Sequence, residues 1–106
     1  QMKSFSFSIR IVRLYQYLIR ESKEYSIAKQ LLRCGTSIGA NVEEASGGQS
    51  KKDFLSKLSI AYKEARETRY WLRILKDTDY LDSKMFSSIF NDCEEVLRIL
   101  SKIQTT

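Results

Sequence analysis

The stretch that decides the fold is residues 27–45, IAKQLLRCGTSIGANVEEA. Its apolar residues recur every three or four positions, which is the period of an amphipathic α-helix. Polar and charged residues occupy the opposite side of the same helical projection. The pattern predicts a helix over about residues 26–45, with Ser26 as its N-cap. Its core face consists of Ile27, Leu31, Cys34, Ile38, Val42 and Ala45.

Two glycines lie inside this predicted helix, one turn apart beside the apolar face. Glycine in a helix interior costs about 1 kcal/mol relative to alanine. Gly35 and Gly39 therefore indicate that the backbone of a neighbouring helix comes close. Asn41, at the edge of the apolar face, fits either an amide that fixes helix register or a functional group.

The same period continues on both sides of this stretch. It predicts further helices over about residues 4–21, 50–77 and 83–104. Gly47 and Gly48 end the second helix, Ser50 with Asp53 begins the third, and Asp82 or Ser83 begins the fourth. Short connections place sequential helices antiparallel. We predict an all-α protein whose residues 1–106 form one domain, an antiparallel up-down-up-down four-helix bundle.

The composition argues against an enzyme. The 106 residues include no histidine, the commonest general base, and only two cysteines, Cys34 and Cys93, which stand alone on apolar faces. We interpret them as two reduced core thiols, with one disulfide as the alternative. No phosphate-binding loop, metal-ligand cluster or cofactor motif occurs. Without a signal peptide or a span long enough to cross a membrane, the prediction is a cytoplasmic protein with no catalytic residues, metal or cofactor.

The formal net charge is +5, and residues 51–76 account for all of it. Four cations of this segment lie on one arc of the third helix, where like charges repel unless an anion faces them. Arginine and tyrosine together suit phosphate contacts and base stacking. Glu64 and Glu67 fit solvated charges, and the basic stripe itself also fits a solvated surface or pairing with acids. The candidate nucleic-acid-binding residues are Arg66, Arg69, Arg73, Lys76, Tyr62 and Lys52 of this segment, and Arg10, Arg13 and Arg20 of the first helix.

The first and third predicted helices carry more apolar surface than one bundle core can cover. The apolar arc of the first spans more than half its circumference, and the third has a second patch apart from its core face. Such patches rarely stay exposed on a soluble monomer, so they predict a homo-oligomer, unless loops or chain ends cover them. The candidate interface residues are Ile60, Trp71, Ile74, Phe5, Val12 and Ile19.

Residues 30–45 resemble the signature of the four-helix proteins of the 23S ribosomal RNA intervening-sequence family, often called S23-like. Residues 52–54 (KDF), 58–61 (LSIA) and 63–72 (KEARETRYWL) continue the resemblance, whereas residues 83–104 match only in pattern. The resemblance implies an antiparallel four-helix protomer and, from structurally known relatives, a homopentamer. It also implies kinship with the accessory variability determinant of diversity-generating retroelements, which partners a reverse transcriptase and binds nucleic acid through a basic surface. The family has no agreed catalytic residues, so none is transferred.

Together these observations predict a non-enzymatic, oligomeric helical bundle that binds RNA or DNA as an accessory protein. Its candidate partners are further copies of itself, RNA or DNA, and a nucleic-acid enzyme. The alternative is a protein–protein adaptor or structural oligomer whose basic stripe docks an acidic partner. A weaker reading is a small-molecule pocket within the oligomer, for which the sequence offers no specific ligand group.

Overall fold

A computed structural model of the protein describes residues 2–47 and 50–105, with Met2 and Thr105 as backbone only. Within these residues the chain forms α1 (Met2–Tyr17), a π-helical turn η1 (Leu18–Ser22), α2 (Ser26–Ser46), α3 (Lys51–Asp77) and α4 (Ser83–Thr105). The predicted all-α fold is confirmed. The predicted role of Gly48 in ending the second helix lies outside the described residues.

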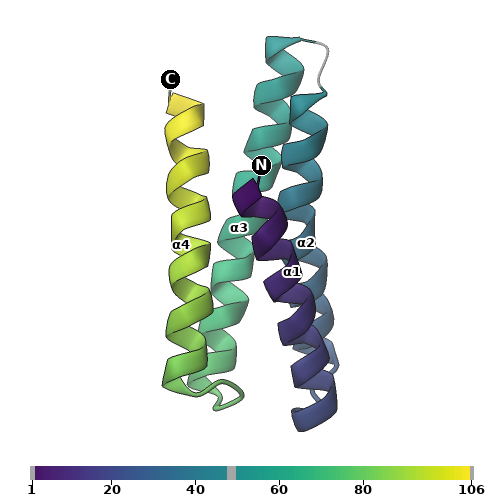
Figure 1. The fold of residues 1–106 in the computed structure, drawn as a ribbon, viewed down its shortest axis with the longest axis vertical. Helices are drawn as coiled ribbons and strands as arrows, with labels where there is room; N and C mark the ends of the chain where they lie inside the picture. Colours follow the sequence, from purple (N-terminus) through teal and green to yellow (C-terminus); the bar gives the residue numbers. More distant parts are fainter. Residues whose placement is uncertain (1, 48–49, 106) are drawn as a thin grey trace.

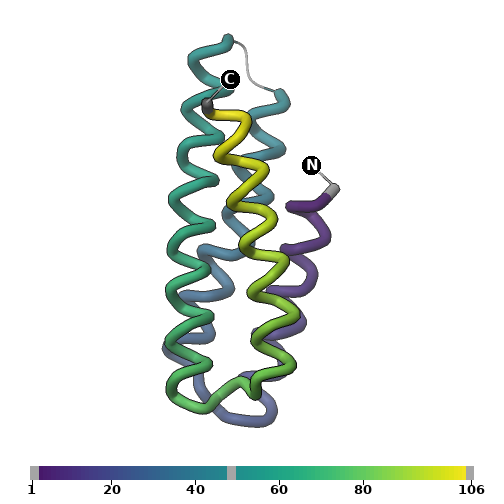
Figure 2. The backbone as a smooth tube through the Cα atoms, turned by 90° about the vertical axis from the view of Figure 1, so that its left-hand side faces the viewer, coloured from purple at the N-terminus to yellow at the C-terminus, as the bar shows by residue number. Residues whose placement is uncertain are grey.

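Consecutive helices run in opposite directions (Figures 1 and 2). In Figure 1, α1 descends from the N-terminus, α2 returns, α3 descends again and α4 rises to the C-terminus. The molecule measures 44 × 20 × 19 Å. α2 and α3 share the most extensive contact, α1 packs on α2 and α4 on α3, and the α1–α4 contact is much the smallest. The bundle is therefore partly open between α1 and α4, the two helices at its edges.

Side chains cap three of the helix starts. Ser50 Oγ accepts from the Asp53 amide at 3.0 Å, and Asp82 Oδ1 accepts from the Met85 amide at 2.8 Å, as predicted. The predicted N-cap Ser26 is wrong, because Glu24 Oε1 accepts from the amides of residues 27 and 28 at 2.5 and 3.4 Å. The chain reverses at Lys23, whose φ is 53°, and this turn brings the Glu24 carboxylate to the start of α2.

Close backbone approach between α1 and α2 explains the two helical glycines. A Cβ atom on Gly35 would lie 2.7 Å from Ile11 Cγ2, and one on Gly39 would lie 2.8 Å from Ser8 Oγ and 3.3 Å from the Ser4 carbonyl. The shortest distance at each glycine, 2.7 Å at Gly35 and 2.8 Å at Gly39, is shorter than packed atoms tolerate. The prediction of a tight helix contact at these glycines is confirmed. Asn41 Nδ2 donates to the Ser37 carbonyl of its own helix at 2.8 Å.

Both cysteines are buried as free thiols. Burial raises the pKa of Cys34 to about 11 and the pKa of Cys93 to about 12. The thiolate is the reactive form of cysteine, and at these pKa values both side chains remain protonated thiols at neutral pH. Both cysteines are therefore unreactive in the folded protein. No helix among the described residues combines the length and the apolar character that a membrane crossing requires.

Candidate nucleic-acid interface

The exposed side of α3 contains a hollow of ≈ 410 Å³ bordered by basic side chains. We call it the α3 hollow. Four cations and a tyrosine rise from successive turns of the same helix, because residues three and four apart share a helix face. The hollow is lined by Lys63, Arg66, Glu67, Arg69, Tyr70 and Arg73.

The cations of the α3 hollow differ in how far their charge is already neutralised. Arg69 Nη1 lies 2.9 Å from Glu94 Oε2 on α4. Lys63, Arg66 and Arg73 are exposed and form no ion pair with any described residue. Glu67, the one acid in the lining, pairs with Arg33 of α2 instead. Three arginine or lysine side chains in the hollow are thus available to an external anion.

The aromatic residue in the hollow is not the one predicted. Tyr62 is half-buried and packs against the core. Tyr70 has 54% of its surface exposed and lines the hollow beside Arg66 and Arg73. Sequence reasoning also missed Lys63, which lies one turn from Glu67. Of the other predicted residues of this segment, Lys52 is exposed outside the hollow, and Lys76 Nζ lies 5.5 Å from the centre of the Phe86 ring on α4.

The three predicted arginines of the first helix do not join the α3 hollow. Arg10 spans from α1 to α4, with Nη1 2.6 Å from Asp92 Oδ2 and Nη2 2.8 Å from Ser88 Oγ. Arg20 Nε donates to Glu21 Oε2 at 2.9 Å, and Arg13 is exposed. Arg10 and Arg13 line a separate cleft between α1 and α4. The candidate residues therefore occupy at least two surfaces, and the α3 hollow is the one richest in unpaired cations.

Asp92→Asn is expected to destabilise the fold by about 1 kcal/mol at pH 7, because Asp92 lies 2.9 Å from Lys3 Nζ as well as 2.6 Å from Arg10. Burial raises the pKa of the Asp92 carboxyl, but the hydrogen bonds and charges of Lys3 and Arg10 outweigh burial and lower it below its ordinary value. This stabilisation is present above the unfolded-state pKa of about 4 and is lost as the pH falls through the folded-state pKa.

Urea unfolding of the unaltered protein and of Asp92→Asn at pH 7 and pH 3 should show a difference in the free energy of unfolding that is smaller at pH 3. Glu43→Gln, at an exposed acid without an ion pair among the described residues, is the control. An Asp92 effect that persists unchanged at pH 3 would rule out this ion-pair account.

Glu64 and Glu67 were predicted as solvated charges, and this is wrong. Arg33 of α2 donates to both carboxylates, with Nη2 2.5 Å from Glu67 Oε2. The indole Nε1 of Trp71 donates to the same oxygen at 3.1 Å. The hydrogen bond from Trp71, which has the larger effect, and the one from Arg33 hold the pKa of Glu67 below its ordinary value. The network joins α2 to α3 across their outer groove.

The apolar residues predicted as an interface are only partly free. Trp71 and Ile19 are half-buried and pack against the core, and Ile74 and Val12 are half-buried. Ile60 keeps 39% of its surface exposed. The clearest apolar surface is on α1, where Phe5 is 57% and Ile9 is 41% exposed around a shallow hollow of ≈ 390 Å³. We call this the α1 apolar face, and it is lined by Phe5, Ser8, Ile9, Val12, Arg13 and Gln16.

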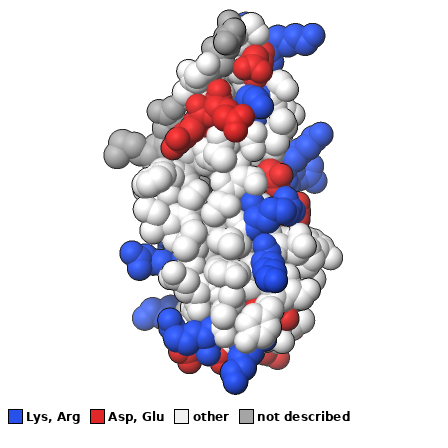
Figure 3. Space-filling view, turned by 90° about the vertical axis from the view of Figure 1, so that its right-hand side faces the viewer, with Lys and Arg blue, Asp and Glu red and all other residues white. Residues whose placement is uncertain are grey.

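Figure 3 shows the side of the molecule on which α1 and α2 lie in Figure 1. A broad area without charged side chains occupies its middle, and lysine, arginine and acidic side chains surround this area. White in this view marks uncharged polar residues as well as apolar ones. The large exposed apolar side chains described on α1 are Phe5 and Ile9.

The fold and these surfaces define an antiparallel four-helix protein with a basic exposed face on its third helix. The comparison with family profiles matches residues 1–102 to the family described as 23S rRNA-intervening sequence protein. The chain belongs to this family, as the resemblance in its sequence indicated.

A solved structure from Bacteroides thetaiotaomicron VPI-5482 is closely similar. It is described as a protein with unknown function from the S23 ribosomal protein family. It shares 50% sequence identity with this chain, covers 98% of this chain and 96% of its own, and superposes with a TM-score of 0.97. The search of curated proteins found no match.

Proposed function

We propose that the protein is a non-enzymatic, homo-oligomeric accessory protein that binds RNA or DNA through the α3 hollow. The observation that carries the proposal is the group of three unpaired cations, Lys63, Arg66 and Arg73, around the exposed Tyr70. Guanidinium groups donate to phosphate oxygens in a fixed fork geometry, and an exposed tyrosine ring offers a surface on which a base stacks.

Three further aspects of the proposal rest on separate observations. The family description names 23S rRNA, which makes structured RNA the first ligand to test. The two buried free thiols are typical of a reducing compartment, which supports a cytoplasmic location. The α1 apolar face supports self-association, and a pentamer and a nucleic-acid enzyme as partner remain predictions.

The test is fluorescence anisotropy with a labelled structured RNA and a random duplex DNA. Three to four phosphate contacts would release that many counterions, so affinity should fall roughly 100-fold between 50 and 200 mM salt. In the variant Arg66→Glu/Arg73→Glu we expect affinity at least about 30-fold weaker and a salt dependence smaller by about two contacts. Arg69 is left unchanged, because a glutamate there would face Glu94 and destabilise the fold.

The matched control reverses two exposed cations elsewhere, Lys29 on α2 and Arg98 on α4. Lys29→Glu/Arg98→Glu changes the net charge by the same amount and should keep most of the affinity. Equal losses in both double variants would show that net charge, and not the α3 hollow, governs binding. No binding of either nucleic acid at 50 mM salt would refute the proposal and favour the alternative, a protein–protein adaptor. The Arg69–Glu94 ion pair shows that a carboxylate can bind to a cation of the α3 hollow, as an acidic partner protein would.

A further inference from the structure

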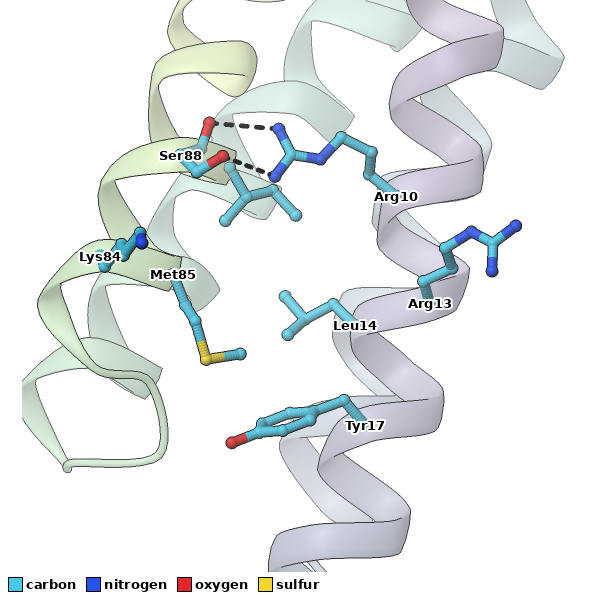
Figure 4. A pocket seen from close by; sticks show the side chains of 8 residues that line it. Arg10, Arg13, Leu14, Tyr17, Lys84, Met85 and Ser88 are labelled. Carbon is cyan, nitrogen blue, oxygen red and sulfur yellow. Dashed lines mark hydrogen bonds between the residues drawn. The ribbon is translucent and has the colours of Figure 1, made fainter.

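The cleft between α1 and α4 is a hollow that the proposed function does not use. We call it the α1–α4 cleft. It has a volume of ≈ 470 Å³, within the usual range of about 300 to 1,000 Å³ for small-molecule sites. It forms where α1 and α4 barely touch, below the hydrogen bonds between Arg10 and Ser88 (Figure 4). Its lining residues are Arg10, Arg13, Leu14, Tyr17, Lys84, Met85, Ser88 and Ile89.

The interior of the cleft is apolar and comes from both helices. In Figure 4 the side chains of Leu14 and Tyr17 point from α1 toward α4, and Met85 points from α4 toward them. Tyr17 and Met85 are only half-buried, so part of this apolar surface is still in contact with water. Covering it with an apolar body releases that water without breaking any helix contact. A methionine thioether also adapts its shape to different apolar ligands.

The rim of the cleft is cationic, and no acid is among its lining residues. Arg10 is already held by Asp92 and Ser88. Arg13 on α1 and Lys84 on α4 are exposed and have no ion pair with a described residue. In Figure 4 the Arg13 guanidinium is turned outward, and exposed side chains of this kind change rotamer within nanoseconds. Two mobile cations thus flank an apolar floor from opposite sides.

From this combination we propose that the α1–α4 cleft binds a small amphipathic anion, an organic carboxylate with an apolar body. The body lies on Leu14, Tyr17 and Met85, and the carboxylate meets Arg13 and Lys84 at the rim. A nucleobase presents acceptors and donors together, whereas Arg10, Arg13 and Lys84 can only donate, and the Tyr17 and Ser88 hydroxyls are the other polar side-chain groups of the lining. The site does not overlap the α3 hollow, but Arg13 also lines the α1 apolar face, so a subunit interface on that face has to leave the Arg13 side chain free to reach the cleft.

The test is a titration of the full chain with dodecanoate and with 2-naphthoate, in which isothermal titration calorimetry measures binding and amide chemical shifts locate the site. We expect saturable binding, with shift changes confined to residues around 10–17 and 84–89. Comparing the two acids distinguishes an aliphatic from an aromatic body. Dodecanol and acetate, which each lack one half of the proposed ligand, should bind at least 10-fold more weakly.

Two variants locate the site. Met85→Glu places a negative charge on the floor and should weaken dodecanoate binding at least 10-fold, whereas Ile99→Glu, at an exposed apolar residue of the same helix outside the cleft, should stay within 2-fold. Arg13→Glu/Lys84→Glu should weaken dodecanoate binding 5-fold or more, with Lys29→Glu/Arg98→Glu as the charge-matched control.

Three outcomes would each overturn the proposal: no saturable binding, chemical-shift changes centred elsewhere, or dodecanol binding as tightly as dodecanoate. The shift mapping uses the unaltered protein, so the result stands even if a variant fails to fold.

Discussion

Gly35→Leu is expected to destabilise the protein by about 3 kcal/mol and to lower its midpoint of thermal unfolding by roughly 10–20 °C. The reason is steric. Even a Cβ atom at this position would lie 2.7 and 2.8 Å from the two γ-carbons of Ile11, which is fully buried. Isoleucine is β-branched, so a change of χ1 would still leave at least one γ-carbon against the new Cβ, and α1 has to move off α2. The measurement is thermal and urea unfolding followed by circular dichroism at one fixed protein concentration.

Gly47→Ala is the matched control, because its added Cβ would lie 3.9 Å from the Glu44 carbonyl oxygen, an ordinary contact distance, and its φ of −94° suits any residue. It should leave stability unchanged or raise it by a few tenths of a kcal/mol. The double variant Gly35→Leu/Ile11→Ala should lose less stability than the two single variants together, because the second change removes the clashing atoms. Strict additivity would mean that the α1–α2 contact is looser than the structure shows.

Phe5→Glu/Ile9→Glu is expected to convert the proposed homo-oligomer into a monomer. Both side chains project from the α1 apolar face, and burying two unpaired carboxylates in an interface costs several kcal/mol, enough to raise the dissociation constant by a factor of 1,000 or more. Both residues are substantially exposed, so the fold of the protomer should survive. Size-exclusion chromatography with light scattering should show a multiple of the 12.4 kDa protomer mass for the unaltered chain, five-fold for a pentamer, and 12.4 kDa for the variant.

Ser6→Glu/Ser87→Glu adds the same charge at exposed positions outside the α1 apolar face and should leave the assembly intact. If the Phe5/Ile9 variant stays oligomeric, the interface lies elsewhere, and Ile60→Glu on α3 is the next variant to measure. An unaltered chain that elutes as a monomer at micromolar concentration would remove the self-association part of the proposed function.

The helices could be predicted from sequence because their information is local. The apolar period of residues 27–45 and the caps Ser50 and Asp82 depend only on residues within one or two turns. The start of α2 at residue 26 was predicted correctly, but its cap was misassigned, because the capping carboxylate of Glu24 reaches the helix only through the left-handed turn at Lys23. The π-helical turn that ends α1 has no sequence pattern by which it could have been recognised.

The candidate site was predicted less completely, because its properties depend on neighbouring helices. Helical spacing placed Arg66, Arg69 and Arg73 on one side of α3, and the structure agrees. Spacing within α3 could not show that Glu94 of α4 neutralises Arg69, or that Arg33 of α2 neutralises Glu67. It also could not rank Tyr62 against Tyr70, since their exposure depends on how the other helices pack around α3. Pairing between helices is the information that a single helical projection lacks.

The thin contact between α1 and α4 has a consequence for how the chain acquires its structure. All the extensive helix contacts join helices that are consecutive in the sequence, and each pair is connected by a short turn. Contacts of this kind form without first closing a long loop, so little chain entropy is lost before packing begins. The contact between α1 and α4, the first and last helices, is much smaller than the contacts between consecutive helices and can form last. Assembly can therefore proceed hairpin by hairpin, beginning with α1 and α2 as the polypeptide emerges from synthesis.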